Sequence, residues 1–369
     1  MAKFDIVIVA NSPGELSSLV KPVAEEFAKK TDCRVILVLT PCQYSSGKEI
    51  EFVRRQKSIS ELITPPEYKD WVIFNRRPKR INFGPKGVVF FIGGDLAHAM
   101  IIAKKLKYPA YAYLNELIAW KSFYKKFYVS DELTYKKLSR RLPVGKMEIV
   151  GDLMVDSVTA QQKWAPEKNV ITFLPGSRQW IIDFMLPLYK ELMNLLKKED
   201  QGLKFQLVSS PFIRTGQLEG TEIIEFDQAN NSELAVTIPG TNTANLATRG
   251  IPMIMLFPLN RPDSIPLEGI PNLIGKIPVL GRMFKKFLAG VVNRKVKYFA
   301  LPNQKADQEI VPEIRGDIDL PATAQKIILL LKDRQKRERM SKELMTAMGQ
   351  PGAAARIVKD IYGQLQATA

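Results

Sequence analysis

The stretch Val170-Ile-Thr-Phe-Leu-Pro-Gly-Ser-Arg178 decides the fold of this chain. Its apolar run predicts a strand that is buried on both faces, as the strands of parallel sheets are. Proline and glycine end that strand, and apolar residues then recur at helical spacing over residues 184–196. A strand, a turn and an amphipathic helix in this order predict one unit of a parallel α/β sheet.

The same order opens the chain and recurs along it. Residues 4–10 form an apolar run, the turn Asn11-Ser-Pro-Gly14 follows, and apolar residues recur at helical spacing as far as Phe27. Further strands are expected at residues 34–40, 88–92, 205–209, 222–226 and 234–238. The two series predict an α/β protein with two Rossmann-like domains, residues 1–165 and 166–345, facing each other across a cleft. A last helix within residues 346–369 can pack back on the first domain.

Composition narrows the class of protein. The chain has 369 residues, 46% of them hydrophobic and 25% charged, which is typical of a folded protein with more than one domain. No run approaches the roughly 20 apolar residues of a membrane-spanning helix. Two cysteines and one histidine, without metal-ligand spacing, argue against a zinc site and a disulfide framework and favour a reducing, cytoplasmic compartment. We expect no metal and no cofactor.

The net charge of +16 requires an anionic partner, which could be nucleic acid, acidic lipid or a diphosphate-bearing substrate. Charge alone does not choose among them. No nucleic-acid-binding module is recognisable, and basic residues alternate with bulky apolar ones.

Two loops of the second half predict a nucleotide-diphosphate site. Each follows a strand and opens a helix, so backbone N–H groups at the helix start can bind phosphate. An arginine at the rim of the first loop can pair with a diphosphate through two hydrogen bonds. The candidate residues are Gly176, Ser177, Arg178, Gly240, Thr241, Thr243 and Asn245.

Two loops of the first half predict the acceptor side. The turn with Asn11, Ser12 and Gly14 offers a helix N-terminus to a polar group. Ile92-Gly-Gly-Asp95 ends an apolar strand, and Asp95 could take a proton from an acceptor hydroxyl. The alternative is that Asp95 only caps the helix over residues 96–106. His98, one turn further along the chain, is expected to pack in or beside that helix and not to take part in catalysis.

At this point the chain resembles the bacterial lipid-A-disaccharide synthases over nearly its whole length. The likeness rests, in order and spacing, on Leu174-Pro-Gly-Ser-Arg178, Pro239-Gly-Thr-Asn-Thr243 with Gly250-Ile-Pro-Met253, and Leu301-Pro-Asn303 with Val311-Pro-Glu313. The resemblance implies the GT-B fold and a UDP-sugar-dependent transferase that acts on a lipid-linked sugar phosphate and inverts the anomeric centre.

The resemblance also implies roles for single residues. Asp95 falls on the family's proposed catalytic aspartate, with Glu15 as the next candidate carboxylate. Arg178 and Asn303 fall on residues that the family needs for activity, and Glu313 belongs to the same donor-side motifs.

The chain departs from the family at several places, one of them Ile181, which stands where the family has an acidic residue three positions after the loop arginine. Asn11 and Glu15 stand where the N-terminal loop of the family has glutamate and aspartate. Asp152 replaces a histidine of the inter-domain segment, and Asn245 replaces the glutamate that would hold the ribose. The transferase chemistry is therefore a firmer prediction than the exact sugar and acceptor, and a UDP-sugar epimerase stays an alternative.

A basic, apolar segment predicts contact with a membrane. Within residues 261–300, an apolar stripe is surrounded by lysine and arginine, the pattern of helices that lie in anionic bilayer interfaces. An ordinary core helix is the alternative. The expected contact residues are Met283, Phe284, Lys285, Lys286, Phe287 and Leu288. We expect a peripheral protein on the inner face of the membrane, whose partners are a UDP-sugar, a lipid acceptor and an anionic surface, and which can form a homodimer.

Overall fold

The computed structural model describes residues 3–41, 49–114, 118–143, 145–158, 163–176, 179–209, 218–258 and 296–367. The chain divides into two compact units. Unit 1 comprises Met1–Ser157 and Gly349–Ala369, and unit 2 comprises Val158–Met348. The observed boundaries therefore lie after residues 157 and 348, where the sequence suggested 165 and 345.

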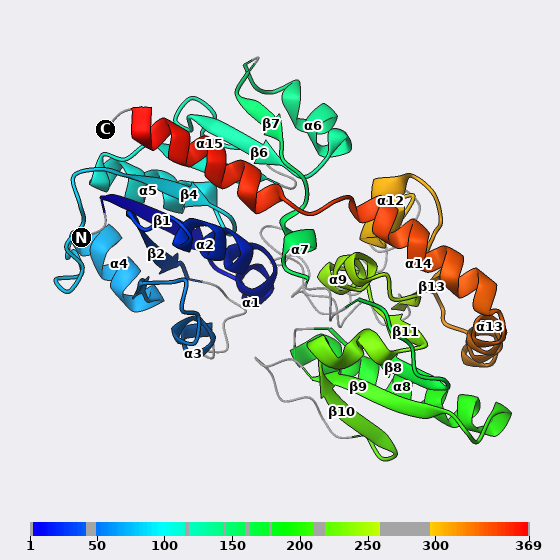
Figure 1. Ribbon diagram of the computed structural model, residues 1–369. Coiled ribbons are helices and arrows are strands. Elements are labelled where there is room, and N and C mark those ends of the chain that lie inside the picture. The colour runs from blue at the N-terminus through cyan, green and yellow to red at the C-terminus, as the bar shows by residue number, and fades with distance from the viewer. Residues whose placement is uncertain are drawn as a thin grey trace, which may run out of the picture. The chain divides into compact units, whose positions relative to one another are not determined.

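Unit 1 is a seven-stranded sheet with helices on both faces (Figure 1). Its strands are β1 (Phe4–Ala10), β2 (Cys33–Leu39), β3 (Glu61–Ile63), β4 (Gly87–Phe91), β5 (Ala110–Leu114), β6 (Lys126–Val129) and β7 (Met147–Ile149). Its helices are α1 (Pro13–Glu15), a π-helical turn (Leu16–Val20), α2 (Lys21–Ala28), α3 (Glu49–Arg54), α4 (Pro65–Phe74), α5 (Leu96–Leu106), α6 (Glu132–Ser139), α7 (Leu153–Asp156) and α15 (Ala353–Ala367).

All strand pairs of this sheet are parallel, in the order β3-β2-β1-β4-β5-β6-β7. All seven residues of β1 are buried, as expected for a strand covered on both faces. On one face Val7 and Val9 share a core with Tyr68 and Trp71 of α4, and α5 and α6 contribute to the same core. On the other face α2 packs against α15.

The C-terminal helix α15 belongs to unit 1. Asp156 accepts hydrogen bonds from the first N–H groups of this segment, at Gly352 (2.5 Å) and Ala354 (2.6 Å). Further along, Asp360 accepts one from Lys126 and one from Tyr128, each at 2.7 Å. These contacts fix the returning chain against the sheet that the N-terminal residues form.

Unit 2 is a six-stranded parallel sheet in the order β10-β9-β8-β11-β12-β13. Its strands are β8 (Val170–Phe173), β9 (Lys204–Ser209), β10 (Thr221–Glu225), β11 (Leu234–Thr237), β12 (Met253–Pro258) and β13 (Glu313–Gly316). Its helices are α8 (Gln179–Glu199), a 3-10 helix (Phe226–Asn231), α9 (Thr241–Arg249), α12 (Leu301–Ala306), α13 (Leu320–Lys332) and α14 (Arg334–Met348).

Both sheets thus have the strand order of a Rossmann fold, and the predicted fold class, two Rossmann-like α/β domains, is confirmed. The strands expected from the sequence lie within one residue of those observed. The helix after β8 is longer than expected, since it begins at Gln179 and continues through Pro187 to Glu199. None of the helices in the described part of the chain has the length and apolar character that crossing a membrane requires.

Candidate functional site

The strand order reverses once in each sheet, between β1 and β4 in unit 1 and between β8 and β11 in unit 2. Such reversals open a crevice beyond the carboxyl ends of the strands, because the following helices go to opposite faces, and ligands of open α/β sheets bind there. All four loops that the sequence singled out lie at these two reversals.

In unit 1 the loop after β1 lies against the loop after β4. The Glu15 carboxylate accepts hydrogen bonds from the N–H groups of Asn11 (3.2 Å) and Ser12 (3.1 Å). A Cβ atom on Gly93 would lie 1.9 Å from Glu15 Oε2, and one on Gly94 would lie 3.0 Å from Asn11 Nδ2. The two glycines therefore permit the close approach of these side chains to the loop that precedes Asp95.

Asp95 is exposed and caps α5, because its Oδ1 accepts a hydrogen bond from the N–H of Ala97 at 2.8 Å. The capping role that the sequence allowed is thus present. It uses one carboxylate oxygen and leaves Oδ2 with no hydrogen bond to the described residues. Capping and proton transfer can therefore coexist at this residue.

His98, one turn further along α5, forms a hydrogen bond with Tyr68 of α4, with 2.5 Å between Nδ1 and the phenol oxygen. Burial lowers the pKa of His98, and the nearby charge of Asp95 opposes this shift. Burial, with a further contribution from Asp95, raises the pKa of Tyr68 to about 12. Tyr68 therefore keeps its proton, and a phenol is the stronger donor of the two, so we assign it as donor to a neutral imidazole.

In unit 2 the two predicted donor loops touch each other. Gly176 follows β8 with a φ of 108°, and a Cβ atom there would lie 2.7 Å from Ile238, which follows β11. Gly240 precedes α9 with a φ of 120°, and a Cβ atom there would have no described atom within 4 Å. No described atom therefore covers this side of the backbone at the start of α9, and Thr241 beside it is exposed.

Thr243 forms hydrogen bonds inside unit 2, and its predicted contact with the donor stays a prediction. It is buried, donates to the carbonyl of Gly240 (2.8 Å) and accepts from the N–H of Leu301 (3.1 Å). Its hydroxyl thus joins the first turn of α9 to the start of α12. Asn245 is partly buried near the same turn.

Asn303 and Glu313 form hydrogen bonds inside unit 2, and their predicted contact with the donor stays a prediction. Asn303 is fully buried; its Nδ2 donates to Val311 and Glu313, and its Oδ1 accepts from the N–H groups of Ile310 and Val311. Glu313 accepts from the N–H groups of Phe299 and Ala300 and from Arg315. The two residues therefore fix the segment that meets Thr243.

Several predicted residues lie outside the described residues. They are Ser177, Arg178, Met283, Phe284, Lys285, Lys286, Phe287 and Leu288. In the described ranges, no group of three or more His, Cys, Asp or Glu side chains could hold a metal ion. Activity without a metal or other cofactor stays a prediction.

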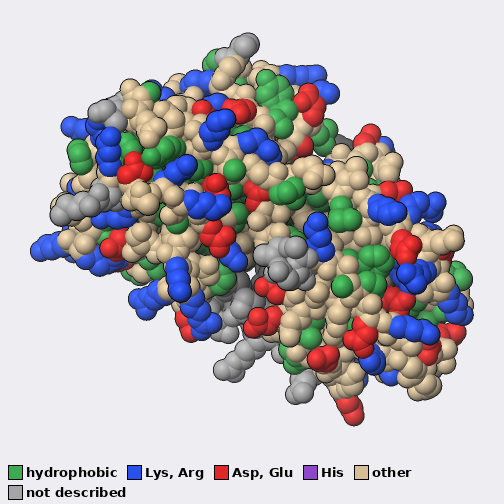
Figure 2. All heavy atoms as spheres, in the orientation of Figure 1, with side chains coloured by type: hydrophobic (Ala, Val, Ile, Leu, Met, Phe, Trp, Pro, Cys, Tyr) green, Lys and Arg blue, Asp and Glu red, His purple; other side chains and the backbone are tan. Residues whose placement is uncertain are grey.

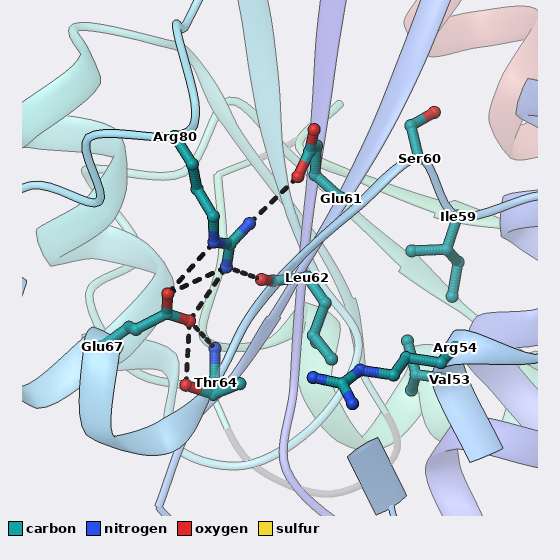
Figure 3. A pocket seen from close by; sticks show the side chains of 9 residues that line it. All are labelled: Val53, Arg54, Ile59, Ser60, Glu61, Leu62, Thr64, Glu67 and Arg80. Atoms are coloured by element: carbon teal, nitrogen blue, oxygen red, sulfur yellow. Dashed lines mark hydrogen bonds and ion pairs between the residues drawn. The ribbon is translucent and has the colours of Figure 1, made fainter. Parts of the chain in front are cut away.

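A cavity of about 510 Å³ lies away from both reversals, at the edge strand β3. Figure 3 shows Arg80 between Glu61 and Glu67 on one side of it and Arg54 on the other. Burial opposes the ionisation of Glu67, but hydrogen bonds from Thr64 and Arg80 outweigh it and lower its pKa. Arg80 thus neutralises much of the negative charge there, and none of the predicted site residues lines the cavity.

Comparison with known proteins supports the fold more strongly than the function. No protein-family model matches the chain. The lipid-A-disaccharide synthase of Prochlorococcus marinus (strain MIT 9313) is 23% identical over 217 residues, which cover 53% of this chain. The chain spans 50% of the length of that relative, so the likeness does not establish the family.

The folds of several solved structures match the fold of this chain over nearly its whole length. UDP-GlcNAc 2-epimerase from Neisseria meningitidis, bound to UDP-GlcNAc, is 13% identical with a TM-score of 0.59, over 97% of this chain and 100% of the other. S. aureus MnaA with UDP is 12% identical with a TM-score of 0.58, over 99% and 97%. The glycotransferase of kitacinnamycin is 11% identical with a TM-score of 0.57, over 98% and 100%. The chain has the two-domain fold that GT-B glycosyltransferases share with UDP-GlcNAc 2-epimerase.

In unit 1 the sequence named Asp95 and Glu15 as candidate site residues and expected His98 only to pack in or beside α5. It missed Tyr68, which comes from a helix 30 positions earlier in the chain. In the sequence, Tyr68 is only an aromatic residue on the buried face of α4, and such a residue cannot be told apart from an ordinary core position.

Proposed function

We propose that this chain is a UDP-sugar-dependent glycosyltransferase that acts on a lipid or lipid-linked sugar. The observation that carries the proposal is that each unit has two loops at its own strand-order reversal, with different chemistry in the two units. In unit 2, Gly240 stands at the start of α9 with no described atom where a Cβ atom would lie, which suits a diphosphate. In unit 1, Asp95 has an unengaged carboxylate oxygen, which suits a general base.

In the proposed reaction Asp95 takes the proton of the acceptor hydroxyl. The acceptor oxygen forms a bond to the anomeric carbon of the sugar, and the bond from that carbon to the UDP oxygen breaks. The electron pair of the broken bond leaves with UDP. Attack on the face opposite to UDP inverts the anomeric centre. Arg178 would pair with the developing charge on the diphosphate, and no metal takes part.

Fewer observations support the lipid acceptor and the peripheral membrane location. They are supported by the likeness to lipid-A-disaccharide synthase over part of the chain, by the net charge of +16, and by the basic, apolar segment at residues 283–288.

A second candidate is a UDP-N-acetylglucosamine 2-epimerase. One of the three structural neighbours described above supports it, an epimerase bound to UDP-GlcNAc. The two candidates share a nucleotide site in unit 2 and differ in whether an acceptor is needed.

One assay separates them. The full chain is incubated with radiolabelled UDP-N-acetylglucosamine, with and without vesicles made from a bacterial lipid extract, and the products are separated into lipid and aqueous fractions. The proposal predicts UDP release and label in the lipid fraction only when vesicles are present. Conversion to the 2-epimer without vesicles would favour the epimerase, and no reaction in either arm would count against both.

A further inference from the structure

Two large apolar side chains stand exposed at the end of α4. Ile73 is 66% exposed and Phe74 is 61% exposed, whereas Tyr68 and Trp71 of the same helix are buried. The helix ends directly after them, because Asn75 adopts a left-handed conformation with a φ of 55°. Neither Ile73 nor Phe74 is needed for the core, so their apolar character calls for another explanation.

Cations surround this pair. The last turn of α5 lies beside the end of α4, since Lys105 Nζ donates to Asn75 Oδ1 at 2.7 Å. Within residues 69–79 and 104–107 the sequence has seven lysines and arginines and a single carboxylate, Asp70. The cations are Lys69, Arg76, Arg77, Lys79, Lys104, Lys105 and Lys107. We call these cations, with Ile73 and Phe74, the α4–α5 basic face.

Three of the cations rest on aromatic rings. Arg76 lies 5.6 Å from the ring centre of Phe74, Arg77 lies 4.4 Å from that of Phe83, and Lys104 lies 5.6 Å from that of Phe123. Figure 2 shows lysine and arginine atoms gathered over the part of unit 1 that contains α4 and α3. Exposed aromatic and aliphatic tips within a field of cations are the pattern of surfaces that enter anionic bilayer interfaces.

We propose that the α4–α5 basic face binds an anionic lipid bilayer, with Ile73 and Phe74 entering the interface and the seven cations contacting lipid phosphates. A nucleic acid fits less well, because an aliphatic side chain such as Ile73 offers no ring on which a base can stack. The chemistry that would recognise the partner is therefore a negatively charged surface with an apolar layer beneath it.

This face is separate from the candidate site. The C-terminal ends of α4 and α5 lie at the amino edge of the sheet, whereas Asp95 begins α5 at the carboxyl edge. The 11 residues of α5 place about 16 Å between the two. The inference depends on the proposed function only for its biological purpose, since bilayer binding is measured without turnover.

The test is sedimentation of the full chain with vesicles of phosphatidylcholine alone or with about one third phosphatidylserine. We expect binding to the anionic vesicles that decreases with salt. Arg76→Glu with Arg77→Glu should weaken it at least about tenfold, since one basic residue near such a surface contributes about 1 kcal/mol, or about fivefold. Ile73→Ser with Phe74→Ser should weaken it about tenfold.

Matched controls come from elsewhere on the surface. Leu329→Ser removes a side chain that is 67% exposed on α13, and Lys136→Glu with Lys137→Glu reverses two exposed cations on α6. Both should leave binding within about twofold, a factor that corresponds to about 0.4 kcal/mol. If the double serine variant fails to fold, the single Phe74→Ser variant takes its place.

Three results would overturn the proposal. Unchanged binding of the Ile73 and Phe74 variant would show a surface attraction without insertion. An equal loss in the α6 control would show that net charge alone is responsible. Tighter binding to a polyuridylate RNA than to vesicles, lost in the arginine variant, would identify a nucleic-acid surface instead. If vesicle binding behaves as expected but no sugar is transferred, the proposed function fails and this inference stands.

Discussion

The two strand-order reversals present different chemistry. In unit 1 the loops expose side chains: Asp95 keeps an oxygen with no bond to the described residues, and the glycines at 93 and 94 serve only to bring Asn11 and Glu15 close. In unit 2 the side chains of Thr243 and Asn303 are used internally, and Gly240 has no described atom where a Cβ atom would lie. A side-chain carboxylate suits proton transfer, and an open helix start suits phosphate binding. The difference predicts that unit 1 supplies the general base and that unit 2 binds the diphosphate.

The largest expected effect is that of Asp95→Asn on turnover. Asparagine caps a helix about as well as aspartate but cannot take a proton, so turnover should fall about 10²–10⁴-fold with little change in UDP affinity. Asp319→Asn is the matched control, because Asp319 is exposed and caps α13 through one hydrogen bond from the N–H of Ala322. Near-normal turnover of Asp95→Asn in steady-state assays would remove the base role.

The next effect is on stability, in unit 2. Asn303→Ala leaves the buried N–H groups of Ile310 and Val311 and the carbonyl of Val311 without their partner. At about 1–3 kcal/mol for each unsatisfied group, the free energy of unfolding should fall by about 3 kcal/mol or more. Urea denaturation checks this, with the exposed Asn82→Ala as control. If Asn303→Ala left the free energy of unfolding unchanged and weakened UDP binding, Asn303 would be assigned to the donor site.

A smaller effect concerns the ionisation of His98. Loss of the Tyr68 hydroxyl in Tyr68→Phe removes a donor to the neutral ring, so the pKa of His98 should rise. Asp95→Asn should lower it, because the Asp95 charge favours the protonated ring. The chain has a single histidine, so its imidazole nitrogen signals in NMR report both shifts without assignment. An N–H at Nδ1, in place of Nε2, would reverse the assigned direction of the hydrogen bond.

His98 also links the free energy of unfolding to pH. In the unfolded chain a histidine titrates near pH 6.5, whereas burial lowers the pKa of folded His98. The unfolded state therefore binds more protons between the two values, and stability is lost as pH falls below about 6.5 toward the folded pKa. Tyr68→Phe should shrink this loss, as denaturation at pH 7 and below would reveal.

The smallest expected effect is that of Glu15→Gln. A glutamine oxygen can still accept the N–H groups of Asn11 and Ser12, so the free energy of unfolding should change by only about 0.5–1 kcal/mol. Glu67→Gln is a matched control, because Glu67 accepts from the N–H of Thr64 at the start of α4 in the same way. A fall in turnover of about 100-fold or more in Glu15→Gln alone would make Glu15 the base.

The sequence was sufficient for the features that depend on neighbouring residues. Each strand, its glycine turn and the helix after it are contiguous, so the positions of Gly176, Gly240 and Asp95 at strand ends follow from the local pattern. It was insufficient where a role depends on distant partners. Asn303 and Glu313 had the residue types of ligand contacts, but their hydrogen bonds are satisfied within unit 2. Tyr68 reaches His98 only because α4 and α5 pack on the same face of the sheet.

The central claim is that UDP binds at the reversal of unit 2. The most direct measurement is the change in backbone amide NMR signals of the full chain as UDP is added. The account predicts the largest changes at Gly176, Gly240 and Thr241, with small changes at Asn11, Gly93 and Asp95. Changes concentrated in the loops after β1 and β4, with those of unit 2 unmoved, would contradict it.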